Sequence, residues 1–352
     1  MMTPANENEL ELKLSEPYSE TVELMKRLDG DILLLGVAGK VGPSLARLAV
    51  RACEAAGVKK RIIGVARFSD PEQKTALERD GVETIVCDLS DADQVAALPK
   101  VKNVIYLAGR KFGDVGSEPL TWIMNVVVPH NVGAAFAGSR IVAFSTGCVY
   151  ALADVTGKGS PESERPVPVG EYANSCLGRE RVFDYHSEKS GSSVLHYRLN
   201  YAIDLRYGVL SDIALPIWEG RPVDRSVPVF NVIWQGDANN RALLCLEYTA
   251  VPGKPLNITG PEFLNTEEVA MKFGELLGKP VTFKGEPVKT AYLNDATESF
   301  KLFGQPKVSA DELIQMTADW IKGGGRNLNK PTHFTVTDGQ FLDEPAADSK
   351  GN

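Results

Sequence analysis

Short, almost wholly apolar segments alternate with helical segments through the first half of the chain, and this alternation restricts the fold more than any other feature. DILLLGV, RIIGVA, ETIVCDL, NVIYLAG and RIVAFST are each short and rich in aliphatic residues. Strands of this kind are typical of a parallel sheet that helices bury on both faces. With right-handed crossovers, the pattern predicts an α/β fold, a Rossmann-type doubly wound parallel sheet. We expect its first strands over residues 31–37, 61–66, 83–89, 103–109 and 140–146.

After residue 150 the pattern changes to a loop rich in proline, glycine and serine, followed by a helix over 171–189 and a strand over 193–201. Residues 211–305 mix short strands, turns and helices, which predicts a smaller mixed α/β C-terminal substrate lobe. Within the acidic N-terminus, we expect residues 1–12 to be disordered and Ser19 to cap a helix over 19–28. The predicted parts are an acidic lead with a helix (1–30), the Rossmann domain (31–205), the substrate lobe (206–323) and a surface or partly disordered tail (324–352). Whether the chain crosses back between the Rossmann domain and the substrate lobe is left open.

Charge and cysteine usage exclude several classes of protein. The 352 residues carry a formal net charge of −8, which is unsuited to non-specific binding of nucleic acid or of an anionic membrane surface. No apolar run approaches the roughly 20 residues of a membrane span, and the polar, acidic start is unlike a signal peptide. The five cysteines and four histidines lack metal-ligand spacing. We therefore expect reduced thiols, no metal site and a cytoplasmic location.

A glycine-rich loop, LLLGVAGKVG, follows the first expected strand and opens the first crossover helix. Gly36 suits a tight turn, Gly39 allows a pyrophosphate to approach the backbone, and Gly42 allows the helix to pack closely on the strand. The N–H groups at the start of the helix then favour a phosphate. Glycines also mark ordinary turns, but the strand–loop–helix context favours a dinucleotide-binding loop.

The ends of the second and third strands bear on the choice of cofactor. An acidic residue after the second strand would favour NAD, whereas here Arg67 follows, with a serine two residues later. A guanidinium suits a 2′-phosphate, so the sequence favours NADP over NAD. An ordinary exposed loop arginine is the alternative. Asp88 and Leu89, at the end of the third strand, are candidates to hold the adenine edge.

The order of these motifs resembles the extended short-chain dehydrogenase/reductase family, the NAD-dependent epimerases and dehydratases, over residues 31–323. STGCVY (145–150) is similar to the family's Ser-Ser-x-x-Val-Tyr motif, and YANSC (172–176) is similar to its Tyr-x-x-Ser-Lys motif except for the lysine. The resemblance implies hydride transfer between a nicotinamide and a hydroxyl or carbonyl substrate, with Tyr172 as acid/base and Thr146 orienting the substrate. It implies a cofactor site made by Gly36, Gly39, Lys40, Val41, Gly42, Asp88, Leu89, Leu107, Ala108, Gly109, Lys111, Asn125 and Tyr172, and it implies Asn200 as a substrate residue.

Cys176 stands where the family's catalytic lysine would be. A free tyrosine has a pKa near 10, and a nearby ammonium normally lowers it by about one to three units. A neutral thiol cannot supply that charge. Lys111, Arg110 and Arg179 are the cations that could substitute for it. Cys176 as a nucleophile is a further reading, but nothing obvious in the sequence would activate its thiol.

The substrate lobe also departs from the family. PVFNVIWQGD resembles the segment Arg-Asp-Tyr-Ile-His-Val-x-Asp, but Phe230 replaces the arginine that grips a sugar-nucleotide phosphate, and Trp234 replaces the histidine. A nucleotide-sugar substrate is therefore doubtful. The two aromatic residues fit either a hydrophobic core or an aromatic or less charged substrate.

Three functions stay open at this point. The leading hypothesis is an NAD(P)-dependent oxidoreductase of the epimerase/dehydratase type acting on a small molecule. The alternatives are a cofactor-binding protein with little or no turnover, used as a redox sensor or assembly partner, and a scaffold without cofactor. The resemblance also implies a homodimer formed through the helices that carry Asn125 and Tyr172.

Overall fold

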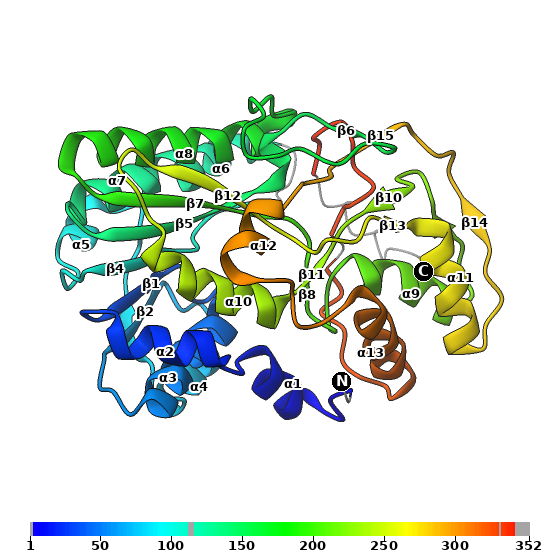
Figure 1. Cartoon of the computed structure of the whole chain (residues 1–352), viewed down its shortest axis with the longest axis horizontal. Coiled ribbons are helices and arrows are strands. Elements are labelled where there is room, and N and C mark those ends of the chain that lie inside the picture. Colours follow the sequence, from blue (N-terminus) through cyan, green and yellow to red (C-terminus); the bar gives the residue numbers. More distant parts are fainter. Residues whose placement is uncertain (1–2, 112–115, 331, 342–352) are drawn as a thin grey trace, which may run out of the picture.

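The computed structural model describes residues 3–111, 116–330 and 332–341. Its main element is a seven-stranded sheet in the order β12-β7-β5-β4-β1-β2-β3, and each neighbouring pair of strands is parallel. Helices cover both faces of this sheet (Figure 1). The predicted Rossmann-type doubly wound sheet is therefore confirmed. The strands are β1 (Ile32–Leu35), β2 (Ile62–Ala66), β3 (Glu83–Val86), β4 (Asn103–Tyr106), β5 (Arg140–Thr146), β7 (Ser193–Leu199) and β12 (Lys254–Ile258).

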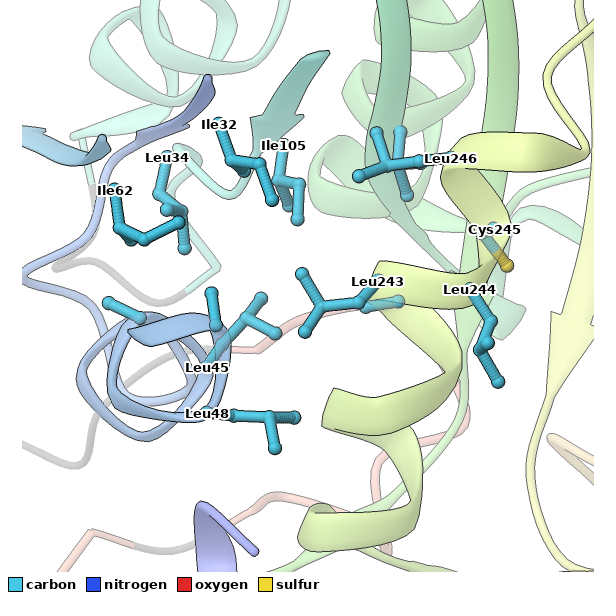
Figure 2. Close-up of a cluster of buried hydrophobic side chains, with 14 of the residues drawn as sticks. Ile32, Leu34, Leu45, Leu48, Ile62, Ile105, Leu243, Leu244, Cys245 and Leu246 are labelled. Atoms are coloured by element: carbon cyan, nitrogen blue, oxygen red, sulfur yellow. The ribbon is translucent and has the colours of Figure 1, made fainter. Parts of the chain in front are cut away.

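Alternate residues of β1 enter two separate hydrophobic cores, which explains why this strand is apolar throughout. Ile32 and Leu34 of β1 lie in the core with α3 and α10, where leucines of these two helices meet the sheet (Figure 2). Leu33 and Leu35 lie in the opposite core with α5, α7 and α8. The helices around the sheet are α2 (Ser19–Arg27), α3 (Gly42–Ala56), α4 (Pro71–Arg79), α5 (Ala92–Ala96), α6 (Glu118–Trp122), α7 (Val128–Ala135), α8 (Gly170–Ser190), α10 (Gln235–Leu244) and α12 (Thr297–Phe303).

A third core lies beside the sheet and is built mainly from α9 (Val209–Trp218), α11 (Thr266–Leu277) and α13 (Ala310–Lys322). Pairs of very short strands accompany these helices, as expected for a mixed α/β lobe. The domain boundaries at residues 30, 205 and 323 stay predictions. No helix in the described ranges is long and apolar enough to cross a membrane. The short strands are β6 (Ala153–Asp154), β8 (Ala202–Ile203), β9 (Val223–Asp224), β10 (Val229–Phe230), β11 (Ile233–Trp234), β13 (Leu264–Asn265), β14 (Phe283–Lys284) and β15 (Thr290–Ala291).

The N-terminus differs from its prediction. A helix, α1 (Glu7–Leu14), lies where disorder was expected, and the side chains of Leu10 and Leu14 are completely buried in the third core. Disorder was the wrong prediction here because two leucines four residues apart bury one helix face against distant partners. The cap at Ser19 is also wrong: Tyr18 occupies the N-cap position of α2, and the Ser19 hydroxyl donates a hydrogen bond to Glu20 instead.

The helical segment before Pro129 is divided into α6, a π-helical turn (Ile123–Val127) and α7, which contains the proline. Pro129 has no N–H group to donate to the carbonyl of Asn125, four residues earlier, so regular α-helical bonding cannot continue through this turn. π-helical turns of this kind often occur at functional sites. This one carries Asn125.

The tail predicted over 324–352 lies partly outside the described residues, since residue 331 and residues 342–352 are not described. Within the described part, Thr332, Phe334 and Phe341 are buried rather than placed on the surface. Figure 1 shows this segment, in red, running between the sheet and the third core.

Candidate active site

The glycine loop connects β1 to α3. Gly36 has a φ angle of +85°, and a Cβ atom there would lie 2.7 Å from the Cα atom of Ala108. A Cβ atom at Gly42 would lie 2.1 Å from the carbonyl oxygen of Val37, so only glycine allows this approach of helix and strand. A Cβ atom at Gly39 would meet only the Gly36 oxygen, at 3.4 Å. The fold thus requires the first and third glycines, whereas the second leaves the loop open in front of the first N–H groups of α3.

The neighbours of the loop lie at the edge of a cavity. Lys40 is exposed, and its Nζ donates a hydrogen bond to the carbonyl oxygen of Ala202 at 3.3 Å. The same ammonium lies 3.6 Å from the centroid of the Tyr207 ring, a cation–π contact. Val41 and Leu107 are partly buried against the core beneath α3. These contacts place Lys40 across the cavity mouth, between the glycine loop and the segment after β8.

The ends of β2 and β3 are also close together. Arg67 is exposed just after β2, and Asp88 accepts hydrogen bonds from the backbone N–H and the hydroxyl of Ser90 at 3.0 and 2.7 Å. Those hydrogen bonds hold the pKa of the Asp88 carboxyl below its usual value, and the charge of Arg67 lowers it further. The Leu89 side chain is buried in the core, which leaves only its backbone for contact with a ligand.

Asn125 connects the loop after β4 to α8. Its Oδ1 accepts from the N–H of Arg110 at 2.9 Å and from Nη2 of Arg179 at 2.6 Å. Its Nδ2 donates to the Arg110 carbonyl and to the hydroxyl of Ser175, both at 2.9 Å. The amide is therefore fully engaged by protein atoms, and its geometric effect is to fix the loop that contains Gly109 against α8.

Tyr172 and Thr146 come together where α8 begins and β5 ends. Burial raises the pKa of the Tyr172 hydroxyl well above its usual value, and the neighbouring Cys176 and Cys148 add to the rise. The positive charge of Arg179 and a hydrogen bond with the Thr146 side chain act in the opposite direction. At neutral pH this hydroxyl is consequently protonated, and it is suited to donate a proton.

Cys176 is completely buried beside Tyr172, and burial raises the pKa of its thiol to about 11. The thiol is therefore neutral near pH 7, and it supplies neither a charge nor a reactive thiolate. Of the three cations considered from the sequence, the Lys111 ammonium lies 6.0 Å from the centroid of the Tyr172 ring. Arg179 acts on the tyrosine hydroxyl, because its positive charge lowers the pKa of Tyr172. Arg110 contacts Asn125 through its backbone.

One cavity, of about 250 Å³, is lined by six of the predicted residues, Lys40, Val41, Lys111, Thr146, Tyr172 and Asn200. The other predicted residues do not line it: Gly36, Gly39, Gly42, Arg67, Asp88, Leu89, Leu107, Ala108, Gly109 and Asn125. The C-terminal segment forms part of its wall. Lys111 Nζ donates to the carbonyl oxygen of Thr332 at 3.1 Å, and the ring of Phe341 contacts the Tyr172 ring edge-on at a centroid distance of 5.6 Å. The chain's own tail thus covers the tyrosine.

On the lobe side of the cavity, Asn200 is buried and its Nδ2 donates to the Asn231 side chain at 3.0 Å. The next residue, Tyr201, has a φ angle of +43°, a conformation that costs energy for a residue other than glycine and often occurs at functional sites. Phe230 and Trp234 are each 1% exposed and belong to the third core, so the aromatic residues are core residues.

Several residues that reach this site were not predicted from the sequence, among them Cys148, Tyr207, Thr332 and Phe341. Cys148 lines the cavity and lies inside the STGCVY motif, so its position could have been noted. Tyr207 follows β8 without any motif. Thr332 and Phe341 come from a tail with a loop-like composition, and nothing local indicates that they return to Tyr172.

No family model matches this sequence, and no curated protein matches it. Solved structures do. UDP-glucuronic acid 4-epimerase from Bacillus cereus in complex with NAD is 18% identical, with a TM-score of 0.70 over 83% of this chain and 98% of that one. UDP-glucose 4-epimerase from Thermus thermophilus, also with NAD, is 22% identical, with a TM-score of 0.67 over 83% and 99%. This is the fold of the extended short-chain dehydrogenases/reductases.

A dTDP-glucose 4,6-dehydratase from Streptomyces venezuelae shares the same fold, at 18% identity and a TM-score of 0.70 over 83% of this chain and 97% of that one. The resemblance read from the motifs is therefore confirmed at the level of the fold. In each case almost the whole of the solved chain is matched, while about a sixth of this chain lies outside the match.

Proposed function

We propose that this protein is an NAD(P)-dependent oxidoreductase of the epimerase/dehydratase type, with Tyr172 as proton donor or acceptor and Thr146 as the orienting hydroxyl. The observation that carries the proposal is their convergence on one cavity, next to the glycine loop at the end of the parallel sheet. Open α/β sheets bind their ligands in this place, outside the carboxyl ends of the strands.

The glycine loop supports a dinucleotide. Gly39 has no backbone or side-chain neighbour closer than 3.4 Å that would forbid a Cβ atom, so the fold alone does not explain a glycine there. Close approach of a pyrophosphate does. In the proposed site the loop from Gly36 to Gly42 holds the pyrophosphate, Asp88 and the Leu89 backbone hold the adenine, and Ala108, Gly109 and Lys111 border the nicotinamide side.

For the second phosphate, Arg67 supports NADP, although the compared structures carry NAD. Arg67 is exposed, and it lies near Asp88, whose negative charge would weaken its attraction for a phosphate. Arg67→Ala is expected to weaken NADPH binding much more than NADH binding, as measured by fluorescence titration. Equal losses for the two cofactors would remove the support for NADP.

When bound, the nicotinamide supplies or accepts the hydride. The chain's own residues do the rest. Tyr172, protonated at neutral pH, gives its proton to the substrate oxygen as a carbonyl group becomes a hydroxyl group, and Thr146 holds that oxygen in place by a hydrogen bond. The raised pKa of Tyr172 favours this donating role and makes proton abstraction from a hydroxyl the harder direction. Phe341 packs edge-on against the ring of the tyrosine and covers part of it.

The substrate is proposed to be a small hydroxyl or carbonyl compound. The compared enzymes are named for sugar nucleotides, and this supports a sugar-like compound. Phe230 is buried in the third core and contacts Phe334 of the tail at a centroid distance of 6.0 Å. No charge for a nucleotide phosphate comes from that position, so a compound without a nucleotide fits better.

A homodimer and a cytoplasmic location belong to the same proposal. Trp122, Ile123 and Val127, on the helical segment that carries Asn125, are 39%, 41% and 42% exposed. Exposed apolar side chains gathered on one helical segment favour contact with another protein surface. A second copy of the chain would cover them through this segment and α8.

The competing function, a cofactor-binding protein without turnover, is favoured by one observation, the neutral thiol of Cys176 in the place of a cation. One experiment separates the two. NADPH or NADH is mixed with a panel of carbonyl compounds, and its absorbance is followed for the wild type and for Tyr172→Phe. Oxidation of the cofactor that Tyr172→Phe abolishes supports the enzyme. Tight cofactor binding with no oxidation across the panel supports the binding protein.

A further inference from the structure

Arg179 is a buried cation one helical turn beyond Cys176 on α8. It is 6% exposed, its Nη1 donates to the carbonyl oxygen of Phe144 at 2.7 Å, and its Nη2 donates to Oδ1 of Asn125 at 2.6 Å. Both acceptors are neutral. The neighbouring carboxylate, Glu180, is bound by another arginine, and Arg179 forms no ion pair with any residue that the structure describes.

A guanidinium in such a place is costly, because buried charges are normally paired with an opposite charge. Its Nε also lacks a hydrogen-bond partner in the described ranges. The loop after β4 nevertheless makes room for it: a Cβ atom at Gly109 would lie 2.4 Å from Nη2 of Arg179. A buried cation with only neutral partners points to an anion that forms beside it during function.

The candidate anion is one of the groups around it. Among the described residues, the titratable groups that act on Arg179 are Cys176, Tyr172 and Glu180 on α8 and Tyr106 on β4. Tyr106 is completely buried, its ring lies 5.7 Å from the guanidinium as a cation–π partner, and its hydroxyl donates to the carbonyl oxygen of Met124, so it has no access to a substrate.

Cys148 after β5 and Lys111 after β4 lie near the Tyr172 ring. Both thiols are held neutral by burial. Lys111 is itself a cation, and its ammonium donates to a carbonyl of the tail. That leaves the oxygen of Tyr172, which lies on the same face of α8 as Arg179, since residues seven apart complete two helical turns.

We propose that Arg179 supplies the positive charge that Cys176 cannot, and that it stabilises the phenolate of Tyr172. The inference rests on the proposed function. The O–H bond of Tyr172 breaks, its proton passes to the substrate oxygen, and the electron pair stays on the phenolate oxygen, whose negative charge the guanidinium stabilises. Arg179 acts through Tyr172, so it is a positioning residue, with Asn125 and the Phe144 carbonyl fixing the orientation of its guanidinium.

The first test needs neither cofactor nor substrate. A difluorotyrosine, whose hydroxyl is more acidic than that of tyrosine, is placed at position 172, and its ionisation is followed by fluorine NMR as the pH is raised. Arg179→Gln is expected to shift this titration upward by about one unit or more, the usual effect of a close opposite charge. Arg179→Lys keeps the charge and is expected to leave the titration near the wild-type position. Arg181→Gln, an exposed arginine on the same helix, is the control.

The titration alone decides the role of Arg179, whether or not turnover is found. An unchanged midpoint in Arg179→Gln would overturn the inference, and so would an equal shift in Arg181→Gln. The absence of hydride transfer by the wild type with every carbonyl compound of the panel would overturn the proposed function instead. If Arg179→Gln fails to fold, the kcat of Cys176→Lys replaces the titration, because this variant leaves Arg179 in place.

Cys176→Lys tests the same idea from the other side, with Cys176→Ser as its control. Since Arg179 already supplies a charge, the added lysine is expected to raise kcat less than about tenfold, the effect of one pKa unit at the transition state. A rise of a hundredfold or more would show that the natural site lacks a cation, and the inference would be wrong. The double variant Cys176→Lys with Arg179→Gln is expected to recover most of the activity that Arg179→Gln loses, at an unchanged KM.

Discussion

The glycine loop offers a matched pair of variants that separates the needs of the fold from the needs of a ligand. An added Cβ atom at Gly39 has its nearest neighbour, the Gly36 oxygen, at 3.4 Å, which is ordinary van der Waals contact. The native backbone of Gly39 also has no positive φ angle. Gly39→Ala should therefore leave the free energy of unfolding unchanged or raise it by about 0.4–1 kcal/mol, since alanine reduces the freedom of the unfolded chain.

The same methyl group would stand where a pyrophosphate has to approach the backbone. Losing one or two charge-assisted hydrogen bonds from N–H groups costs roughly 1.5–3 kcal/mol, so the Kd for NADPH should rise at least tenfold. Gly42→Ala is the counterpart. Its Cβ atom would lie 2.1 Å from the Val37 oxygen, so the backbone has to move, and the protein should lose several kcal/mol of stability.

Two measurements check this pair. Urea unfolding gives the stability of each variant, and titration of NADPH fluorescence gives its affinity. Cofactor binding by Gly39→Ala at wild-type affinity would refute the assignment of this loop to a pyrophosphate. A stable Gly42→Ala would show that the close contact of α3 with β1 is not a requirement of the fold.

Three further outcomes are expected. Glu180 is buried with Arg198, and although burial raises the pKa of its carboxyl, hydrogen bonds from Arg198 hold that pKa below its usual value. Glu180→Gln should therefore lower the free energy of unfolding in urea by about 3–5 kcal/mol at pH 7, whereas the exposed Glu188→Gln should lower it little. The difference between wild type and Glu180→Gln should shrink as the pH falls below about 4, where a free glutamate becomes protonated. Phe341→Ala should expose Tyr172 and, because burial is the main cause of its raised pKa, move the alkaline limb of the kcat profile to lower pH; an unmoved limb would contradict the covering role of the tail. Ile123→Asp should convert a dimer into monomers in analytical ultracentrifugation, and a dimer that survives it would place the interface elsewhere.

The sheet and the glycine loop could be predicted because their signals are local. Five strands follow from short segments rich in apolar residues, and the demands on Gly36 and Gly42 follow from the strand–loop–helix context. Tyr172 and Thr146 could be paired because two motifs in the right order imply neighbouring positions. Their shared cavity agrees with that pairing, while their roles stay proposals.

The remaining features depend on partners far away in the sequence. Leu10 and Leu14 order α1 by packing against helices some two hundred residues later, and Phe341 returns to Tyr172 from the far end of the chain. The orientation of Arg179 depends on Asn125, which a π-helical turn brings to it. No short window of sequence contains these contacts, so periodicity and composition could not reveal them.

We propose above all that a nicotinamide cofactor binds between the glycine loop and Tyr172. The most direct test is a crystal structure of the chain with NADP. We expect the pyrophosphate against the backbone of Gly39 at the start of α3, and the nicotinamide ring in the cavity beside Tyr172 and Thr146. A cofactor bound elsewhere, or a loop that stays closed to it at saturating concentration, would contradict the claim.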